Sequence, residues 1–288
     1  MAETASVTFF YHSGLMIAVE KTLLIFDYWE GDQDGSLPLD SRLTERDMQG
    51  FEQVIFLVSH DHEDHMDPKI YAYNFNRLPI TYVLSSDIPP QNRGLRISEG
   101  ETIRVGNATI TAYGSTDKGV SFYVSVGGVN IFHAGDLNFW HWREEYSLSE
   151  IRRAENAFYR ALEPLEQLPM DIAMFPVDPR QGGMYDAGAN HFIMTVKPRV
   201  FIPIHWRDKP EVSVDYARRG RTRYTDVVSL TRPREQAVLT FDNTRLGIHI
   251  IAPVQRFAPS GTHKKDVELE RLSGNDPFSE TDLPVSLK

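Results

Sequence analysis

Short apolar runs separated by polar or glycine positions alternate along the first half of the chain. Runs this short predict β-strands rather than helices. We expect consecutive antiparallel strands at residues 7–11, 15–19 and 23–26. Later strands are expected at residues 54–58, 81–84, 102–105, 108–113, 120–126 and 129–132, with a hairpin turn at Gly127 and Gly128.

The second half of the chain contains longer patterns with helical spacing. Apolar residues recur at that spacing between residues 147 and 167 and predict a helix there. Another helix is expected at 187–196, and shorter ones from Thr44 and over 69–75. The remaining apolar runs predict strands at residues 171–175, 200–204, 238–241 and 246–250, the last two closing a second sheet.

The composition changes toward the end of the chain. From residue 258 onward Pro, Gly, Ser, Lys and acidic residues dominate, and apolar periodicity stops. Such a segment cannot bury enough apolar surface to order itself. The sequence therefore predicts one domain over residues 1–257 and an extended or disordered tail over residues 258–288.

Histidines and carboxylates gather directly after the apolar run 54–58. That run is continuous, which is typical of a strand covered on both faces. His60 and His62 follow it, and in an extended segment residues two apart point to the same side, so both can bind one ion. Asp64 and His65 come next, at a turn, and can face a second position. Imidazoles and carboxylates are the ligands that a borderline divalent ion such as zinc prefers, whereas a solvated acidic loop rarely holds three histidines.

This stretch resembles the H-x-H-x-D-H signature of the metallo-β-lactamase superfamily. Other motifs occur in the order of that superfamily: Asp27 after residues 22–26, Asp136 in His133-Ala-Gly-Asp136, and His205 after Phe201-Ile-Pro-Ile. The resemblance spans residues 7–250. Within the superfamily it is similar to the branch that contains ascorbate-6-phosphate lactonase and many uncharacterised metal-dependent hydrolases.

The resemblance implies an α/β fold, a four-layer αββα sandwich of the metallo-β-lactamase type. It also implies two metal positions that share Asp136, which with Asp64 would form the catalytic pair. The first position would hold His60, His62 and Asp136, and the second Asp64, His65, Asp136 and His205. Asp27 would orient the histidine loop from behind the ligands.

One superfamily ligand is missing from the sequence. Members usually carry a further histidine in the loop that corresponds to residues 112–119, and this loop has none. The first position is therefore short of one imidazole. A single ion, a first site completed by water or by Ser115, Thr116 or Asp117, and a histidine from elsewhere are all consistent with this gap. His141 is the candidate from elsewhere, and we expect it to line the pocket.

Three further residues are candidates for the pocket wall. His12 sits in the first turn, where it either serves the turn or lies beside the metal pocket. Asp178 and Arg180 directly follow the strand expected at 171–175, where side chains of layered α/β folds line pockets. Arg180 either clamps a carboxylate or phosphate or forms a surface ion pair.

Composition narrows the classes of function. The 288 residues carry a net charge of −10, which disfavours nucleic acid as the main partner. Cysteine is absent, so metal ligands are limited to nitrogen and oxygen. The start of the chain has no signal-peptide pattern and no apolar run approaches the roughly 18 residues of a membrane span, so we expect no membrane contact and a cytoplasmic location. Oligomeric state is left open.

The leading hypothesis is a hydrolase that uses metal-activated water on a small-molecule ester, lactone or phosphorylated substrate. Zinc is expected, one or two ions per chain, with manganese or iron as alternatives. A phosphodiesterase or ribonuclease of the same superfamily is a second hypothesis, although the acidic balance disfavours it. A non-catalytic metal-binding module is a third, motivated by the missing histidine.

Overall fold

The computed structural model describes residues 3–31, 37–73, 78–242 and 246–253, which lie in one compact unit over residues 1–254. The predicted tail lies outside the described residues, so the domain boundary stays a prediction. Within the described ranges, no helix is long and apolar enough to cross a membrane.

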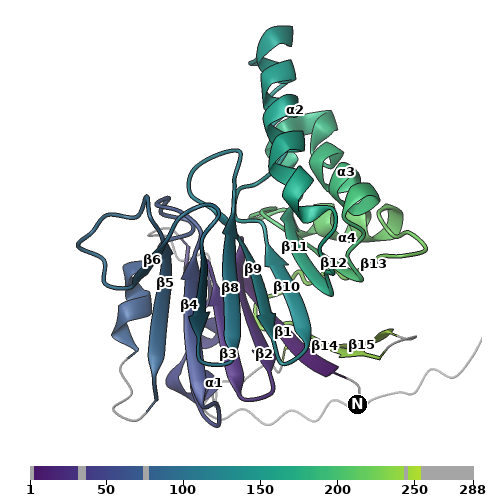
Figure 1. The fold of residues 1–288 in the computed structure, drawn as a ribbon. Coiled ribbons are helices and arrows are strands. Elements are labelled where there is room, and N and C mark those ends of the chain that lie inside the picture. Colours follow the sequence, from purple (N-terminus) through teal and green to yellow (C-terminus); the bar gives the residue numbers. More distant parts are fainter. Residues whose placement is uncertain (1–2, 32–36, 74–77, 243–245, 254–288) are drawn as a thin grey trace, which may run out of the picture. The chain divides into compact units, whose positions relative to one another are not determined.

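The first sheet has the strand order β15-β14-β1-β2-β3-β4-β5-β6 (Figure 1). Its strands are β1 (Glu3–Tyr11), β2 (Gly14–Val19), β3 (Thr22–Phe26), β4 (Gln53–Val58), β5 (Ile80–Ser85), β6 (Leu95–Ile97), β14 (Gln236–Phe241) and β15 (Leu246–Ile251). The predicted antiparallel arrangement of the first three strands is confirmed. From β3 to β6 the neighbours run parallel.

The second sheet has the order β13-β12-β11-β10-β9-β8-β7. Its strands are β7 (Thr102–Val105), β8 (Ala108–Tyr113), β9 (Ser121–Val126), β10 (Val129–His133), β11 (Ile172–Pro176), β12 (Val200–Ile204) and β13 (Asp226–Val227). Strands β10 to β13 run parallel. The hairpin between β9 and β10 turns at Gly127 and Gly128, which both have positive φ, as predicted.

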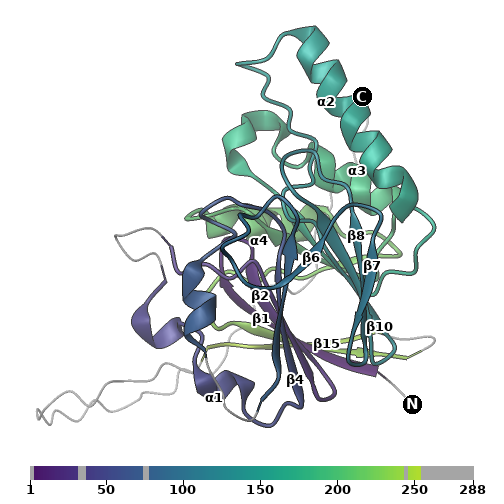
Figure 2. The same ribbon diagram turned by 60° about the vertical axis from the view of Figure 1, so that its left-hand side comes forward.

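Helices cover the outer faces of both sheets. The main ones are α2 (Leu148–Leu162), α3 (Ala187–Thr195) and α4 (Pro210–Arg219), which Figure 1 shows next to β11, β12 and β13. The other side carries α1 (Glu45–Met48) and the 3-10 turn η2 (Pro68–Ala72), whereas η1 (Leu39–Ser41), η3 (Glu163–Leu165) and η4 (Pro179–Met184) are short connections. Figure 2 shows α1 beside the first sheet, away from α2 and α3.

Three apolar clusters join these layers. One lies between the sheets and brings Leu24 and Ile55 together with Ile110 and Met174. A second packs the outer face of the second sheet on α2, α3 and α4 through aromatic residues such as Phe175. A third packs the outer face of the first sheet on α1 and η2. The layer order is helix, sheet, sheet, helix, which confirms the predicted αββα sandwich.

The prediction that 238–241 and 246–250 close the second sheet is wrong. β14 pairs antiparallel with β1, from Glu3 opposite Phe241 to Thr8 opposite Gln236, so both strands extend the first sheet. Apolar periodicity identifies a strand, but its partner is set by contacts far away in sequence. The prediction also missed several elements, among them α4 and β6. α4 buries only Ser213 and Tyr216, so it lacks a clear apolar stripe, and β6 has three residues.

The parallel strands place the candidate residues at one edge of the sandwich. Asp27 follows β3, His60 closely follows β4 and Asp136 closely follows β10, while Asp178 and His205 follow β11 and β12. Side chains that follow the carboxyl ends of parallel neighbours meet at a common edge, where α/β folds bind their ligands.

Candidate metal centre

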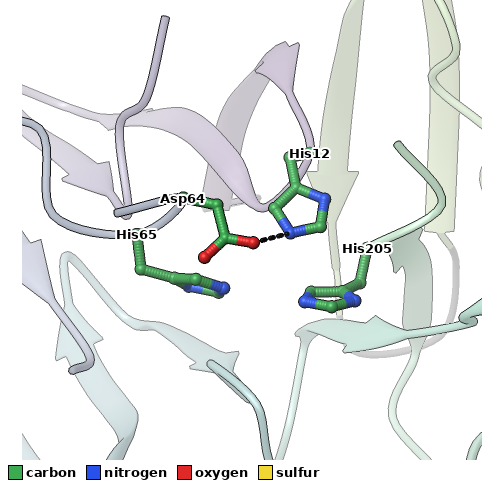
Figure 3. Close-up of side chains that lie close together, drawn as sticks. All are labelled: His12, Asp64, His65 and His205. Atoms are coloured by element: carbon green, nitrogen blue, oxygen red, sulfur yellow. Dashed lines mark ion pairs between the residues drawn. The ribbon is translucent and has the colours of Figure 1, made fainter. Parts of the chain in front are cut away.

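Two groups of metal-ligand side chains lie at this edge. His12, Asp64, His65 and His205 form one cluster, and His60, His62, Asp117 and Asp136 form the other. In each cluster the ligand atoms lie within 4.8 Å of one another. Figure 3 shows the side chains of the first group turned toward one another, although they come from three separate segments of the chain.

Asp136 connects the two clusters. Its Oδ1 lies 3.1 Å from Nε2 of both His65 and His205, and its Oδ2 lies 3.5 Å from Nε2 of His60. One carboxylate therefore faces both positions. Burial alone raises the pKa of Asp136, but the imidazoles of His65 and His205 hold it well below its usual range, so the group stays ionised.

Five buried ligand atoms of the clusters lack hydrogen-bond partners. Nε2 of His65 and of His205, both ring nitrogens of His12 and Oδ1 of Asp136 have no hydrogen-bond partner among the described residues. Buried polar atoms are normally satisfied, and an unpaired one is costly. Imidazole nitrogens and a carboxylate oxygen converging in this way fit a divalent ion that accepts nitrogen and oxygen ligands.

Carboxylates behind the ligands fix the ring orientation of two histidines. His65 Nδ1 lies 2.8 Å from Asp27 Oδ2, and His205 Nδ1 lies 2.9 Å from Asp178 Oδ2. Each Nδ1–H donates to a carboxylate, which holds the ring with Nε2 directed at the centre, the usual support for histidine ligands in metal sites. Burial lowers the pKa of both rings, but Asp136 and the carboxylate at Nδ1 raise it above its usual value, so a metal ion bound at Nε2 would displace a proton.

Asp27 also reaches the other cluster through Ser59. Its two oxygens accept hydrogen bonds from the Ser59 N–H at 2.8 Å and from the Ser59 hydroxyl at 2.6 Å. Since that hydroxyl donates to Asp27, its oxygen is left to accept from His60 Nδ1, 2.9 Å away. One fully buried carboxylate thus orients a histidine in each cluster.

Burial keeps the rings of His12 and His60 neutral. Burial, together with nearby His205, lowers the pKa of His12 to about 3. Burial, together with nearby His65, lowers the pKa of His60 to about 4. At neutral pH both rings are uncharged, and a neutral imidazole is the form that binds a metal.

The backbone around the centre is strained. His12, Asp27 and His205 have φ values of 55°, 41° and 67°, in the left-handed region that residues other than glycine rarely adopt. The carbonyl of His12 accepts a hydrogen bond from the N–H of His205 at 3.2 Å, which ties two of these positions together. Strain of this kind persists where surrounding structure fixes it, commonly at functional sites.

Asp117 lies where the missing histidine was expected. Its Oδ2 is 3.7 Å from His62 Nδ1, and the Thr116 hydroxyl in the same loop donates to the carbonyl of Asn138 at 2.6 Å. The loop approaches the histidine segment closely at Gly119, where a Cβ would lie 2.0 Å from the carbonyl oxygen of Ser59. The Ser115 hydroxyl accepts a hydrogen bond from the Asp117 N–H at 3.3 Å and belongs to neither cluster.

His141 is in neither cluster and does not line the cavity beside them. Its ring contacts Phe139 edge to face, and its backbone N–H donates a hydrogen bond to Gln181 Oε1 at 3.2 Å. The pocket-lining role expected for it therefore has no support in this geometry.

Asp178 and Arg180 form an ion pair through three nitrogen–oxygen contacts, and Arg180 lines the cavity.

The sequence placed His12 near the pocket but did not identify it as a potential ligand, and it did not single out Arg207 or Asn138. Arg207 Nη2 donates to Asp64 Oδ2 at 2.8 Å, beside the 3.3 Å contact of that oxygen with His12. Asn138 lines the cavity beside the ligands. The signals for these residues are weak, because a lone histidine in a turn, an arginine and an asparagine are common.

The clusters open into a cavity of about 320 Å³, which we call the inner cavity. His62, Asp64, Asp117, Asp136 and His205 form its metal side. The facing wall is made by the segment after β10 and by α2, through Asn138, Trp140, Trp142, Tyr146, Ala154 and Ala157. A compact substrate can therefore lie between the ligands and an aromatic wall.

Comparison with known proteins agrees with this geometry, although no family model matches the chain. A UPF0173 metal-dependent hydrolase of Pyrobaculum neutrophilum is 22% identical over 225 residues, covering 73% of this chain and 87% of the relative. One from Pyrococcus furiosus is 24% identical over 229 residues, covering 73% and 88%.

Among solved structures, the metallo-β-lactamase fold protein YhfI from Bacillus subtilis matches with a TM-score of 0.52 at 13% identity, over 83% of this chain and 100% of that chain. The fold is that of metallo-β-lactamase fold proteins, and the two ligand clusters fit a divalent metal centre. In sequence, the chain is similar to the proteins named UPF0173 metal-dependent hydrolases.

Proposed function

We propose that the protein hydrolyses a small-molecule ester, lactone or phosphorylated substrate, with zinc bound at the two clusters. The observation that carries the proposal is the pair of adjoining clusters joined by Asp136 at one side of the inner cavity. The donor set of nitrogen and oxygen also suits manganese and iron.

Each residue of the centre has a distinct part in this proposal. His12, Asp64, His65 and His205 would hold one ion, and His60, His62 and Asp117 another, with Asp136 serving both. The chemistry that divalent ions supply in such a site is to lower the pKa of a water molecule toward neutrality and to polarise the substrate oxygen. Asp136 stays ionised and can orient that water through the oxygen it presents to each position.

Asn138 has the geometry of a hydrogen-bond donor to the substrate. It is 1% exposed, and its Oδ1 accepts a hydrogen bond from the N–H of Phe139 at 2.9 Å. That bond assigns the amide orientation and leaves Nδ2 without a partner among the described residues. Because Asn138 lines the inner cavity beside Asp136, we propose that Nδ2 donates to the oxygen of the scissile group.

Replacing Asn138 with alanine is expected to lower kcat by about 100-fold, the usual cost of removing one donor that stabilises a developing negative charge. The effect should fall on kcat more than on KM, because the hydrogen bond strengthens in the transition state. Steady-state kinetics would measure it. Metal content serves as the control, and a variant that keeps both its metal and its full kcat would contradict the role.

The proposed function is tested by removing and restoring the metal. The protein is treated with a chelator, dialysed, and assayed on a panel of aryl esters, lactones and phosphodiesters. Hydrolysis should disappear with the metal and return on addition of zinc or manganese. Turnover that survives complete metal removal would refute the metal-dependent mechanism.

A further inference from the structure

A second cavity adjoins the inner one and shares two of its residues. This outer cavity has a volume of about 410 Å³, and both cavities are lined by Trp142 and Arg180. Its other walls come from the segment after Trp142 and from η4, including Gln181 and the pair Gly182 and Gly183. A substrate with its scissile bond at the metal clusters can therefore extend past Trp142.

Arg180 presents a guanidinium group at the junction. Its Nε and Nη2 are bound to Asp178, whereas Nη1 has no hydrogen-bond partner among the described residues. The guanidinium carbon lies 5.8 Å from the centre of the Trp142 ring, and the side chain is 48% exposed. The pairing with Asp178 holds the planar group in place, so its free edge is a pre-organised donor.

Gln181 supplies a second donor. The residue is only 5% exposed, and its Oε1 accepts a hydrogen bond from the N–H of His141. This contact assigns the amide orientation and leaves Nε2 buried without a partner in the described part of the chain. A buried donor without a partner is costly, and in the wall of a cavity it is a donor that a ligand can satisfy.

Space is available beside these donors. Gly182 and Gly183 line the outer cavity, and a Cβ added to either would meet nothing within 4 Å. Gly182 has φ 56° and ψ −129°, a conformation that favours glycine. The remaining charged residues of the wall are Arg143, Glu144 and Glu145, and all three are exposed. The donors without partners, on Arg180 and Gln181, therefore set one part of this cavity apart from its exposed, charged rim.

We propose that the outer cavity binds an anionic group of the substrate, a carboxylate or a phosphate, through Arg180 Nη1 and Gln181 Nε2. The proposal rests on the proposed hydrolysis and narrows its substrate class to esters that carry a negative charge away from the scissile bond. Trp142 lies between the two subsites and contacts the connecting part of the substrate. The protein carries a net charge of −10, and a local donor pair would offset the repulsion between that charge and an anionic substrate.

The test compares three acetate esters on the metal-loaded protein: 4-carboxyphenyl acetate, 4-acetoxyphenyl phosphate and the neutral 4-carbamoylphenyl acetate. The Gln181→Glu variant keeps an acceptor for the His141 N–H but replaces the donor with a negative charge. We expect kcat/KM for both anionic esters to fall by about 10-fold and that for the neutral ester to change by less than about 2-fold. The ratio of the two anionic esters in the unmodified protein distinguishes carboxylate from phosphate.

The matched variant is Glu144→Gln, which removes a negative charge from the same cavity and should raise kcat/KM for the anionic esters only. Equal effects of Gln181→Glu on all three esters would overturn the anionic subsite. If the unmodified protein hydrolyses the neutral ester as well as the anionic ones, the proposed hydrolysis is supported and the anionic subsite is refuted.

Binding provides a readout that does not depend on turnover. Calorimetric titration compares 4-hydroxybenzoate and 4-hydroxyphenyl phosphate with 4-hydroxybenzamide. The anions should bind more tightly than the amide, and Gln181→Glu should weaken the anions alone by about 10-fold. Equal affinity for anion and amide would overturn the subsite even if no ester is hydrolysed, whereas anion binding without any hydrolysis would refute the proposed function instead.

Discussion

Replacement of Asp136 with asparagine is expected to lower kcat/KM by about 1,000-fold or more and to reduce the metal content of the protein. The amide has nearly the same shape, but it lacks the charge that faces His60, His65 and His205. Stabilisation of transition-state charge at a metal site contributes several kcal/mol, and each 1.4 kcal/mol corresponds to a factor of ten in rate.

The control for this variant is Asp215→Asn, an exposed carboxylate of α4 that pairs with Arg218. It makes the same chemical change away from the clusters and should leave metal content and turnover unchanged. Kinetics and elemental analysis of both variants are the measurements. Full activity of Asp136→Asn would show that the two clusters do not act through a shared carboxylate.

Replacement of Asp27 with asparagine is expected to weaken metal binding by about 10- to 100-fold, the usual cost of losing the carboxylate behind a histidine ligand. The effect should reach both clusters, because Asp27 accepts from His65 directly and from Ser59, which in turn accepts from His60. An asparagine side chain has one acceptor oxygen and one NH2 group. One of the donors that now bind Asp27 would therefore face an N–H instead of an oxygen.

Competition with a chromophoric chelator measures the metal affinity. Asp61→Asn is the matched control, since Asp61 lies between His60 and His62 in the sequence but belongs to neither cluster. An unchanged affinity in Asp27→Asn would mean that the rings are positioned by packing alone.

The sequence predicted those features that depend on local pattern. The short apolar runs identified most strands, and β4 followed by His60, His62, Asp64 and His65 pointed to a metal site because so many potential ligands rarely occur together by chance. The layer order followed from the resemblance. Each of these inferences used residues that lie close together in the chain or motifs in a fixed order.

The features that escaped prediction depend on contacts between distant segments. β14 pairs with β1 at the opposite end of the chain, which no local pattern reveals. His12 is turned toward Asp64 by a left-handed backbone and a hydrogen bond from His205. Asp117 was one of several residues proposed for the gap, and its position beside His62 depends on how closely Gly119 approaches Ser59.

The measurement that tests the metal centre most directly is the metal content per chain, determined by elemental analysis of protein purified without chelator or nickel resin. We expect two divalent ions per chain, because each of the two clusters offers several ligand atoms and Asp136 faces both positions. Protein that contains no metal, even after incubation with zinc and manganese, would contradict the assignment of these clusters as a metal centre.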